Sequence, residues 1–162
     1  MKKAFIVVAA IVFSLVFSIY VAGPAAAASV KPPATVCFTF SDGGYDFNFL
    51  LVTKAASGTI AMKTTKYKAY SVTGALSIDG SNAVPIFGSA TALTNTSGDN
   101  IFRFNVSGTV ISLGTLNFSA RGTWNLTDET GDTQALVTST GGSTGYSGTL
   151  TRIPCDSFDF AQ

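Results

Sequence analysis

The chain has 162 residues, of which 46% are hydrophobic and only 12% are charged. This length indicates one folded domain. The sequence contains no histidine, which excludes Ser-His-Asp and Cys-His nucleophiles and every histidine-ligated metal site.

The N-terminus has the order of parts found in a secretory signal peptide. Lys2 and Lys3 precede an uncharged apolar run, and Pro24 is followed by an alanine run that ends at Ala28. We therefore expect cleavage after Ala28, as in bacterial export, which leaves residues 29–162 as a single periplasmic or extracellular domain. The apolar run is also close to the roughly 20 residues that span a bilayer, so an uncleaved anchor is the alternative.

The charge of the expected mature domain argues against nucleic acid as a partner. Removing Lys2 and Lys3 from the ten basic residues leaves eight, against nine acidic residues. Nucleic-acid-binding domains instead concentrate positive charge on one face. The only basic cluster, at 63–68, falls in an expected hairpin.

Alternation of apolar and polar residues with period two runs through the rest of the chain and predicts strands. We expect eight or nine of them, at 35–40, 46–53, 57–64, 67–79, 83–94, 100–112, 115–127, 133–139 and 145–153. Turns are predicted where Gly, Asp, Asn and Ser cluster, at 42–44, 79–82, 97–100, 112–114 and 128–132, with a Gly/Ser/Thr loop at 140–145.

Consecutive hairpins of long strands predict an all-β fold, an antiparallel up-and-down (meander) β-barrel of about eight strands. A two-sheet β-sandwich is the alternative. In a barrel with an even number of strands, the first and last strands are neighbours, so Cys37 and Cys155 would meet at the closing seam. An even number of cysteines in an exported chain indicates a disulfide. Cys37 is out of phase with Phe38, so this bond should lie outside the barrel.

The predicted barrel is similar in architecture to lipocalins and avidins, and Gly122-Thr123-Trp124 resembles the G-x-W motif of those families. That motif lies on their first strand, whereas here it lies near the end of the chain. The resemblance therefore implies an architecture only, and no residue roles. The outward positions carry residues such as Arg103, Asn105 and Arg121, which do not form a lipid-facing band, so no stable membrane insertion is expected.

Five glycines fall inside the predicted strands, at Gly74, Gly88, Gly108, Gly122 and Gly148. Glycine weakens a flat sheet, so its repeated use needs a cause. Sharp coiling of a closed barrel is one explanation. Close approach of a ligand or of the opposite wall is the other.

Inward-facing aromatic residues are the candidate ligand-binding residues. They are Tyr70, Phe102, Phe104, Phe118, Trp124 and Tyr146. They either fill an ordinary core or line a cavity for a small apolar molecule. Arg152 shares the inward phase of Leu150 and would lie at the mouth of the barrel.

Two functions follow from these alternatives. The first is an exported barrel that binds a small apolar ligand in its interior. The second is a structural or surface-interaction protein with a solid core, whose Thr/Ser/Asn-rich outer face contacts a partner. Enzymatic activity is not expected, because the G-x-S-x-G match at 141–145 lacks a histidine partner.

No metal or other cofactor is expected. The carboxylates that could hold calcium are Asp42, Asp46, Asp128, Glu129 and Asp132, and all of them fall in predicted turns. Aspartate is favoured in turns because it bonds the local backbone, and neither group matches the spacing of an EF-hand loop.

Overall fold

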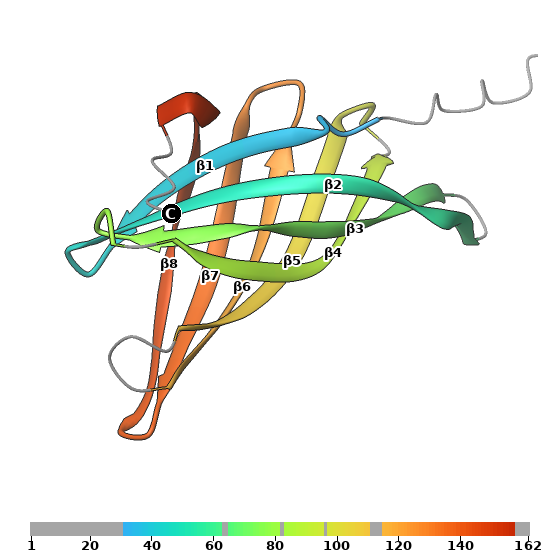
Figure 1. Ribbon diagram of the computed structural model, residues 1–162. Helices are drawn as coiled ribbons and strands as arrows, with labels where there is room; N and C mark the ends of the chain where they lie inside the picture. The colour runs from blue at the N-terminus through green and yellow to red at the C-terminus, as the bar shows by residue number, and fades with distance from the viewer. Residues whose placement is uncertain (1–30, 63–64, 82, 96, 111–114, 158–162) are drawn as a thin grey trace, which may run out of the picture.

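The computed structural model describes residues 31–62, 65–81, 83–95, 97–110 and 115–157. They form eight antiparallel strands that pair in sequence order and close into a barrel (Figure 1). The strands are β1 (Thr35–Asp42), β2 (Tyr45–Met62), β3 (Thr65–Ile78), β4 (Val84–Thr94), β5 (Asn100–Val110), β6 (Leu116–Asn125), β7 (Thr130–Ser139) and β8 (Gly142–Ile153), and a 3-10 helix, η1 (Cys155–Ser157), follows them. The predicted meander barrel is confirmed. The predicted signal peptide and the predicted turn at 112–114 lie outside the described residues.

The segment 57–64, predicted as a possible separate strand, instead continues β2. Its described residues pair with β3 beyond a register shift between Ala55 and Thr59. The small residues of this stretch resemble a break in the sequence, but a β-bulge absorbs extra residues without ending a strand. The barrel therefore has eight strands and not nine.

Two predicted connections are shorter than expected. The turn predicted at 128–132 ends at Glu129, because Thr130 already pairs with Asn125 in β6. The loop predicted at 140–145 is reduced to a tight turn, since Gly142 pairs with Ser139 of β7. Pairing with a neighbouring strand outweighs the low strand propensity of Gly, because that propensity depends strongly on context.

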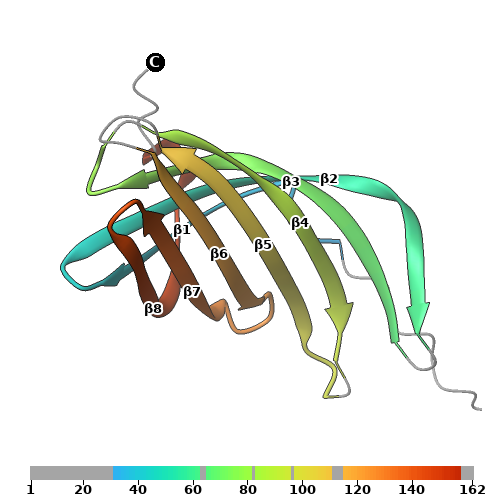
Figure 2. The ribbon, with the colours of Figure 1, turned by 90° about the horizontal axis from the view of Figure 1, so that it is seen from below.

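Strict alternation separates the inside of the barrel from its outside. In β6, the inward residues Phe118, Ala120 and Trp124 are buried, while Ser119 and Arg121 are exposed. In Figure 1, β1 to β3 run across the view and β6 to β8 run steeply down behind them, so opposite walls of the barrel cross (Figure 2). The inward side chains of both walls form one core. Each large apolar side chain buried there stabilises the fold by roughly 1.5–3 kcal/mol.

The seam between β1 and β8 is the shortest ladder of the barrel. It has three register pairs, from Cys37 with Ile153 to Thr39 with Thr151, whereas β1 and β2 share eight. Beyond the ladder, the Ser147 amide donates a hydrogen bond to Asp42 Oδ2 over 2.7 Å. Only a short regular ladder therefore closes the barrel between its first and last strands.

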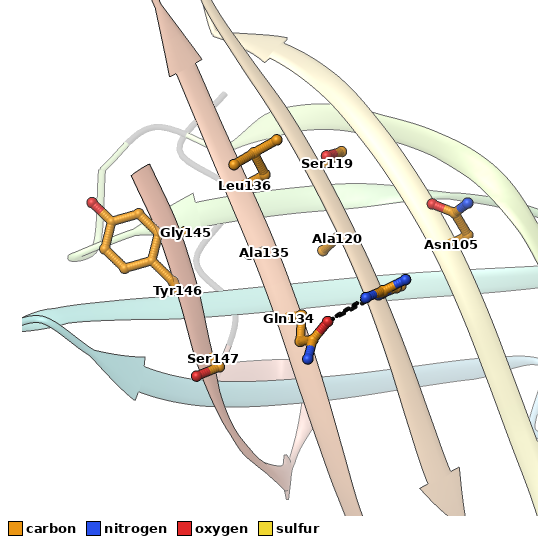
Figure 3. Close-up of a pocket in the computed structure, with 10 residues that line it drawn as sticks. Asn105, Ser119, Ala120, Gln134, Ala135, Leu136, Gly145, Tyr146 and Ser147 are labelled. Atoms are coloured by element: carbon orange, nitrogen blue, oxygen red, sulfur yellow. Dashed lines mark hydrogen bonds between the residues drawn. The ribbon is translucent and has the colours of Figure 1, made fainter. Parts of the chain in front are cut away.

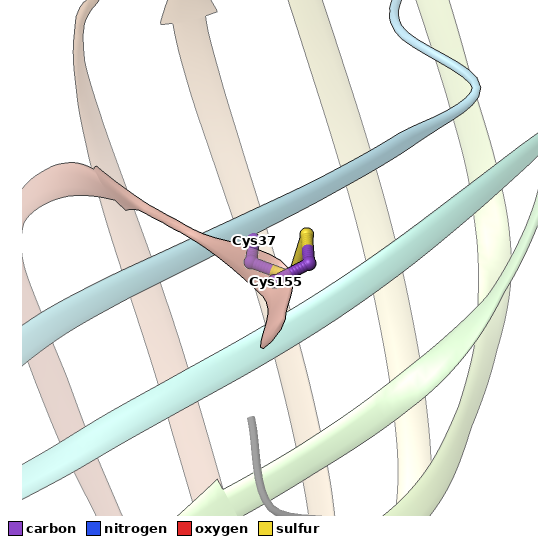
Figure 4. Close-up of a disulfide and its surroundings, with 2 residues drawn as sticks. All are labelled: Cys37 and Cys155. Atoms are coloured by element: carbon purple, nitrogen blue, oxygen red, sulfur yellow. A yellow bond between two sulfur atoms is a disulfide. The ribbon is translucent and has the colours of Figure 1, made fainter. Parts of the chain in front are cut away.

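A disulfide reinforces this seam, as the sequence predicted. Cys37 and Cys155 are bonded, with their Cα atoms 5.2 Å apart (Figure 4). Cys37 lies outside the apolar core but is only 1% exposed. A bond at this position is compatible with an oxidising compartment.

Crowding explains why glycine is used inside the strands. A Cβ atom at Gly74 would collide with the carbonyl oxygen of Leu50 in the neighbouring strand, and Gly88 and Gly108 face neighbouring carbonyls in the same way. At Gly122 the added atom would instead meet the ring of Phe104. Neighbouring strands and core rings therefore lie where these side chains would be.

Candidate binding surface

Five of the six predicted aromatic ligand-binding residues are buried in the core. Their exposed fractions are 7% for Tyr70, 0% for Phe102, 3% for Phe104, 2% for Phe118 and 2% for Trp124. Burial raises the pKa of the Tyr70 phenol above its ordinary value of 10.0, because desolvation disfavours the phenolate.

Three of these rings, those of Phe104, Phe118 and Trp124, contact two phenylalanines of β1 and β2. The ring of Phe38 lies 6.1 Å from that of Phe104 and 4.7 Å from that of Trp124. The ring of Phe49 lies 5.8 Å from Phe118 and 6.3 Å from Phe104. These centroid separations are those of packed aromatic pairs. Side chains therefore fill the space between these rings.

The two remaining predicted residues are less buried, although Tyr146 still packs against the core. Tyr146 is half-buried near the start of β8, where its ring lies 4.9 Å from that of Phe47. Arg152 lies near the end of β8 and pairs in register with Phe38, so it has the inward phase that the sequence predicted. Its guanidinium nevertheless remains at the surface, 2.9 Å from the carboxylate of Glu129, with both side chains more than half exposed.

Two of the carboxylates predicted in turns accept local hydrogen bonds. The Ser41 hydroxyl donates to Asp46 Oδ1, and the Asn125 side-chain amide donates to Asp128 Oδ2 over 2.8 Å. In the described part of the chain, no group of three or more possible metal-ligating residues is placed to hold an ion. The glycine-rich match at 141–145 lies on the β7–β8 turn and the start of β8, a strand and not a helix.

The outer face carries rows of polar side chains. The register of the sheet aligns six exposed residues in one row across β3 to β8, namely Ser71, Ser89, Asn105, Arg121, Gln134 and Ser147. A parallel row, two residues away along the strands, consists of Arg103, Thr123, Asp132 and Thr149. Neighbouring residues within a row are held about 5 Å apart by strand spacing.

Two open grooves lie over this face between β5 and β8. One has a volume of about 550 Å³ and lies between Asn105, Leu136 and Tyr146 (Figure 3). The other has a volume of about 770 Å³ and extends to Arg103 and Asp132. Both are lined by Arg121, Gln134 and Ser147, so the grooves adjoin.

Arg121 lies where the grooves meet, and its side chain is hydrogen-bonded to a neighbouring strand. It donates hydrogen bonds from Nε and Nη2 to Oε1 of Gln134, over 3.0 and 2.6 Å (Figure 3). A guanidinium has five N–H donors, so most of them remain free for a ligand. Because Gln134 is neutral, the charge of Arg121 is not cancelled by this partner.

The alternation of residues in β5 and β6 predicted Arg103 and Arg121 on the outer face, but Gln134 and Ser147 were not predicted to be neighbours of Arg121. Alternation shows that Gln134 and Ser147 point outward. It does not show which residues of neighbouring strands lie side by side, because that depends on the strand register. Among the described residues, no helix has the length and hydropathy needed to cross a bilayer. No protein-family model, curated protein or solved structure matches the chain.

Proposed function

We propose that the protein is an exported binding module that acts through the outer face of β5 to β8, and that its partner is a hydroxyl-rich polymer such as a polysaccharide. The observation that carries this proposal is the pair of adjoining grooves around a guanidinium that is hydrogen-bonded to Gln134 and forms no ion pair among the described residues. Preorganised polar groups lower the entropy lost on binding.

The side chains of the grooves match the chemistry of a sugar. Asn105, Ser147 and Thr149 offer amide and hydroxyl groups that exchange hydrogen bonds with ligand hydroxyls. Leu136 is 44% exposed and lines the smaller groove, so it offers apolar contact for the C–H face of a sugar ring. The polar rows continue across several strands, which suits an extended polymer.

The alternative, an apolar guest inside the barrel, requires space that the core rings now fill. A guest would have to displace rings such as Phe104 and Phe118 from contacts with Phe38 and Phe49. Interiors packed in this way resist added volume, at a cost of about 1–3 kcal/mol for even a few methylenes. The packing therefore favours the outer face.

Export is part of the proposal and has its own measurement. It is supported by the signal-like segment 1–28 and by the cysteine pair at disulfide distance. The intact mass of protein recovered from the periplasm or medium should correspond to residues 29–162, less two hydrogens for the disulfide. A mass that retains residues 1–28 contradicts cleavage.

Affinity electrophoresis tests the binding surface. The folded protein is run in native gels that contain neutral polysaccharides (dextran, hydroxyethyl cellulose) or acidic ones (alginate, polygalacturonate). We expect at least one polymer to retard it. Ser147→Tyr should abolish the retardation, because Ser147 lines both grooves.

Ser89→Tyr is the matched control, since Ser89 is exposed on the same row but lines neither groove. It should remain retarded like the original protein. Equal retardation of both variants, or unchanged mobility in every polymer, overturns the proposal. An added mass in native mass spectrometry that disappears after solvent extraction would instead support an interior guest.

A further inference from the structure

We infer that the larger groove binds an oxyanion carried by the polymer, a carboxylate or a sulfate, between Arg103 and Arg121. This inference rests on the proposed function and narrows its ligand to acidic polysaccharides. The three arginines of the chain differ in the groups that their guanidinium groups contact.

The two groove arginines are held close together by the sheet. Asn105 is the register partner of Arg121, and Arg103 lies two residues before Asn105 on β5. Arg103 and Arg121 are therefore diagonal neighbours on one face, with Cβ atoms about 7–8 Å apart. A single carboxylate or sulfate between them is within reach of both long side chains, and guanidinium groups bind such oxyanions with paired hydrogen bonds.

Neither guanidinium forms an ion pair among the described residues, although Asp132 is a diagonal neighbour of Arg121. Arg152 forms an ion pair with Glu129, but Arg121 bonds the neutral amide of Gln134. Within the described residues, Arg103 has no ion pair and no side-chain hydrogen bond, although Asp132 lines the same groove. Two neighbouring like charges repel each other, and an anion between them removes this repulsion.

Asp132 contributes a different contact. It lies in the same row as Arg103, with Thr123 between them in register. An ionised carboxylate only accepts hydrogen bonds, so it repels an oxyanion but accepts bonds from hydroxyl groups. The groove thus has a cationic part and a hydroxyl-binding part, which together fit a ring that carries both hydroxyl groups and an acid.

The three arginines give three Nε–H signals in a ¹⁵N–¹H spectrum, one for each site. The protein is titrated with oligogalacturonate (carboxylated), a sulfated oligosaccharide, and maltooligosaccharide as the neutral probe. We expect the acidic probes to shift the Arg103 and Arg121 signals and to leave Arg152 unchanged. The stronger of the two acidic probes identifies the preferred oxyanion.

Arg103→Gln should weaken binding of the acidic probe about tenfold, the effect of losing one charge-assisted contact. Arg152→Gln is the matched control and should leave the affinity unchanged. The oxyanion inference would be overturned if the neutral probe bound as tightly as the acidic probes and Arg103→Gln did not change the affinity. If Ser147→Tyr still abolished binding in that case, the proposed surface would be retained. Absence of binding by every probe would overturn both.

Discussion

Replacing Gly122 by alanine tests whether the barrel is solid. Gly122 is buried on the inner face of β6, and an added Cβ atom would overlap the ring of Phe104. That ring is 3% exposed and packs against Phe38 and Phe102, with each centroid 6.1 Å away. It cannot move aside without disturbing its neighbours. We therefore expect Gly122→Ala to lower the free energy of unfolding by about 1–3 kcal/mol, the usual effect of overpacking a filled core.

Urea unfolding followed by the fluorescence of Trp124 measures this change. Trp124 is the only tryptophan of the chain and is 2% exposed, so unfolding transfers it fully into water. Gly145→Ala is the matched control, because a Cβ atom there meets nothing within 4 Å. The control should change the free energy of unfolding by no more than about 0.5 kcal/mol.

A second substitution shows whether the effect arises from Phe104. In the Phe104→Leu background the ring is absent, so adding Gly122→Ala should be less destabilising than in the original protein. We expect a coupling energy of roughly 0.5–3 kcal/mol between the two sites, as for residues in contact. If Gly122→Ala is as mild as Gly145→Ala, the core has free space beside β6. The reasoning for a solid barrel is then refuted, and an interior guest becomes the better hypothesis.

Two further predictions concern the seam and the buried tyrosine. Cys37→Ala/Cys155→Ala should lower the free energy of unfolding by about 2–4 kcal/mol, because the bond closes a loop with a sequence separation of 118. Reduction of the original protein should give the same urea midpoint as the double variant. An unchanged midpoint after either treatment contradicts this prediction. Because burial raises the pKa of Tyr70 above 10.0, the unfolded chain ionises first, so the stability present below pH 10 falls as pH rises toward the folded-state pKa. Tyr70→Phe should make this alkaline fall shallower, and equal slopes for the two proteins would show that Tyr70 does not contribute.

The sequence was informative about the fold because inward and outward residues alternate along most strands. In β5 and β6, the predicted inward residues Phe102, Phe104, Phe118 and Trp124 lie in the core, and an even strand number brings Cys37 next to Cys155. The strand boundaries were predicted wrongly where the local composition is typical of loops but the residues pair with a neighbouring strand. The small residues near Ala55 and the glycines at 141–145 resemble loops, and only pairing with β3 and β7 keeps them in strands.

The candidate site was less predictable, because it depends on strand register. Alternation assigned Arg121 to the outer face, yet its hydrogen-bonded neighbour Gln134 is 13 residues away on β7. A shift of one residue in that pairing would send Gln134 to the other face. Turn length fixes register, and the turn between β6 and β7 was predicted at the wrong residues. The row of outward residues that contains Arg121 and Gln134 therefore could not be predicted from the sequence alone.

Core and surface are linked because one alternating pattern produces both. Arg121 is flanked in β6 by the inward residues Ala120 and Gly122, so the contact of Gly122 with Phe104 also sets the position of the Arg121 backbone. A core packed without free space holds the outer rows rigidly, which is what a preorganised surface site requires. Gly122→Ala should therefore weaken binding of an acidic oligosaccharide as well as lower stability. Gly74→Ala crowds the Leu50 carbonyl and lines neither groove, so it should lower stability with a smaller effect on the Arg121 signal. Equal effects of both variants on that signal would indicate that the site responds to stability in general and not to the local packing beneath β6.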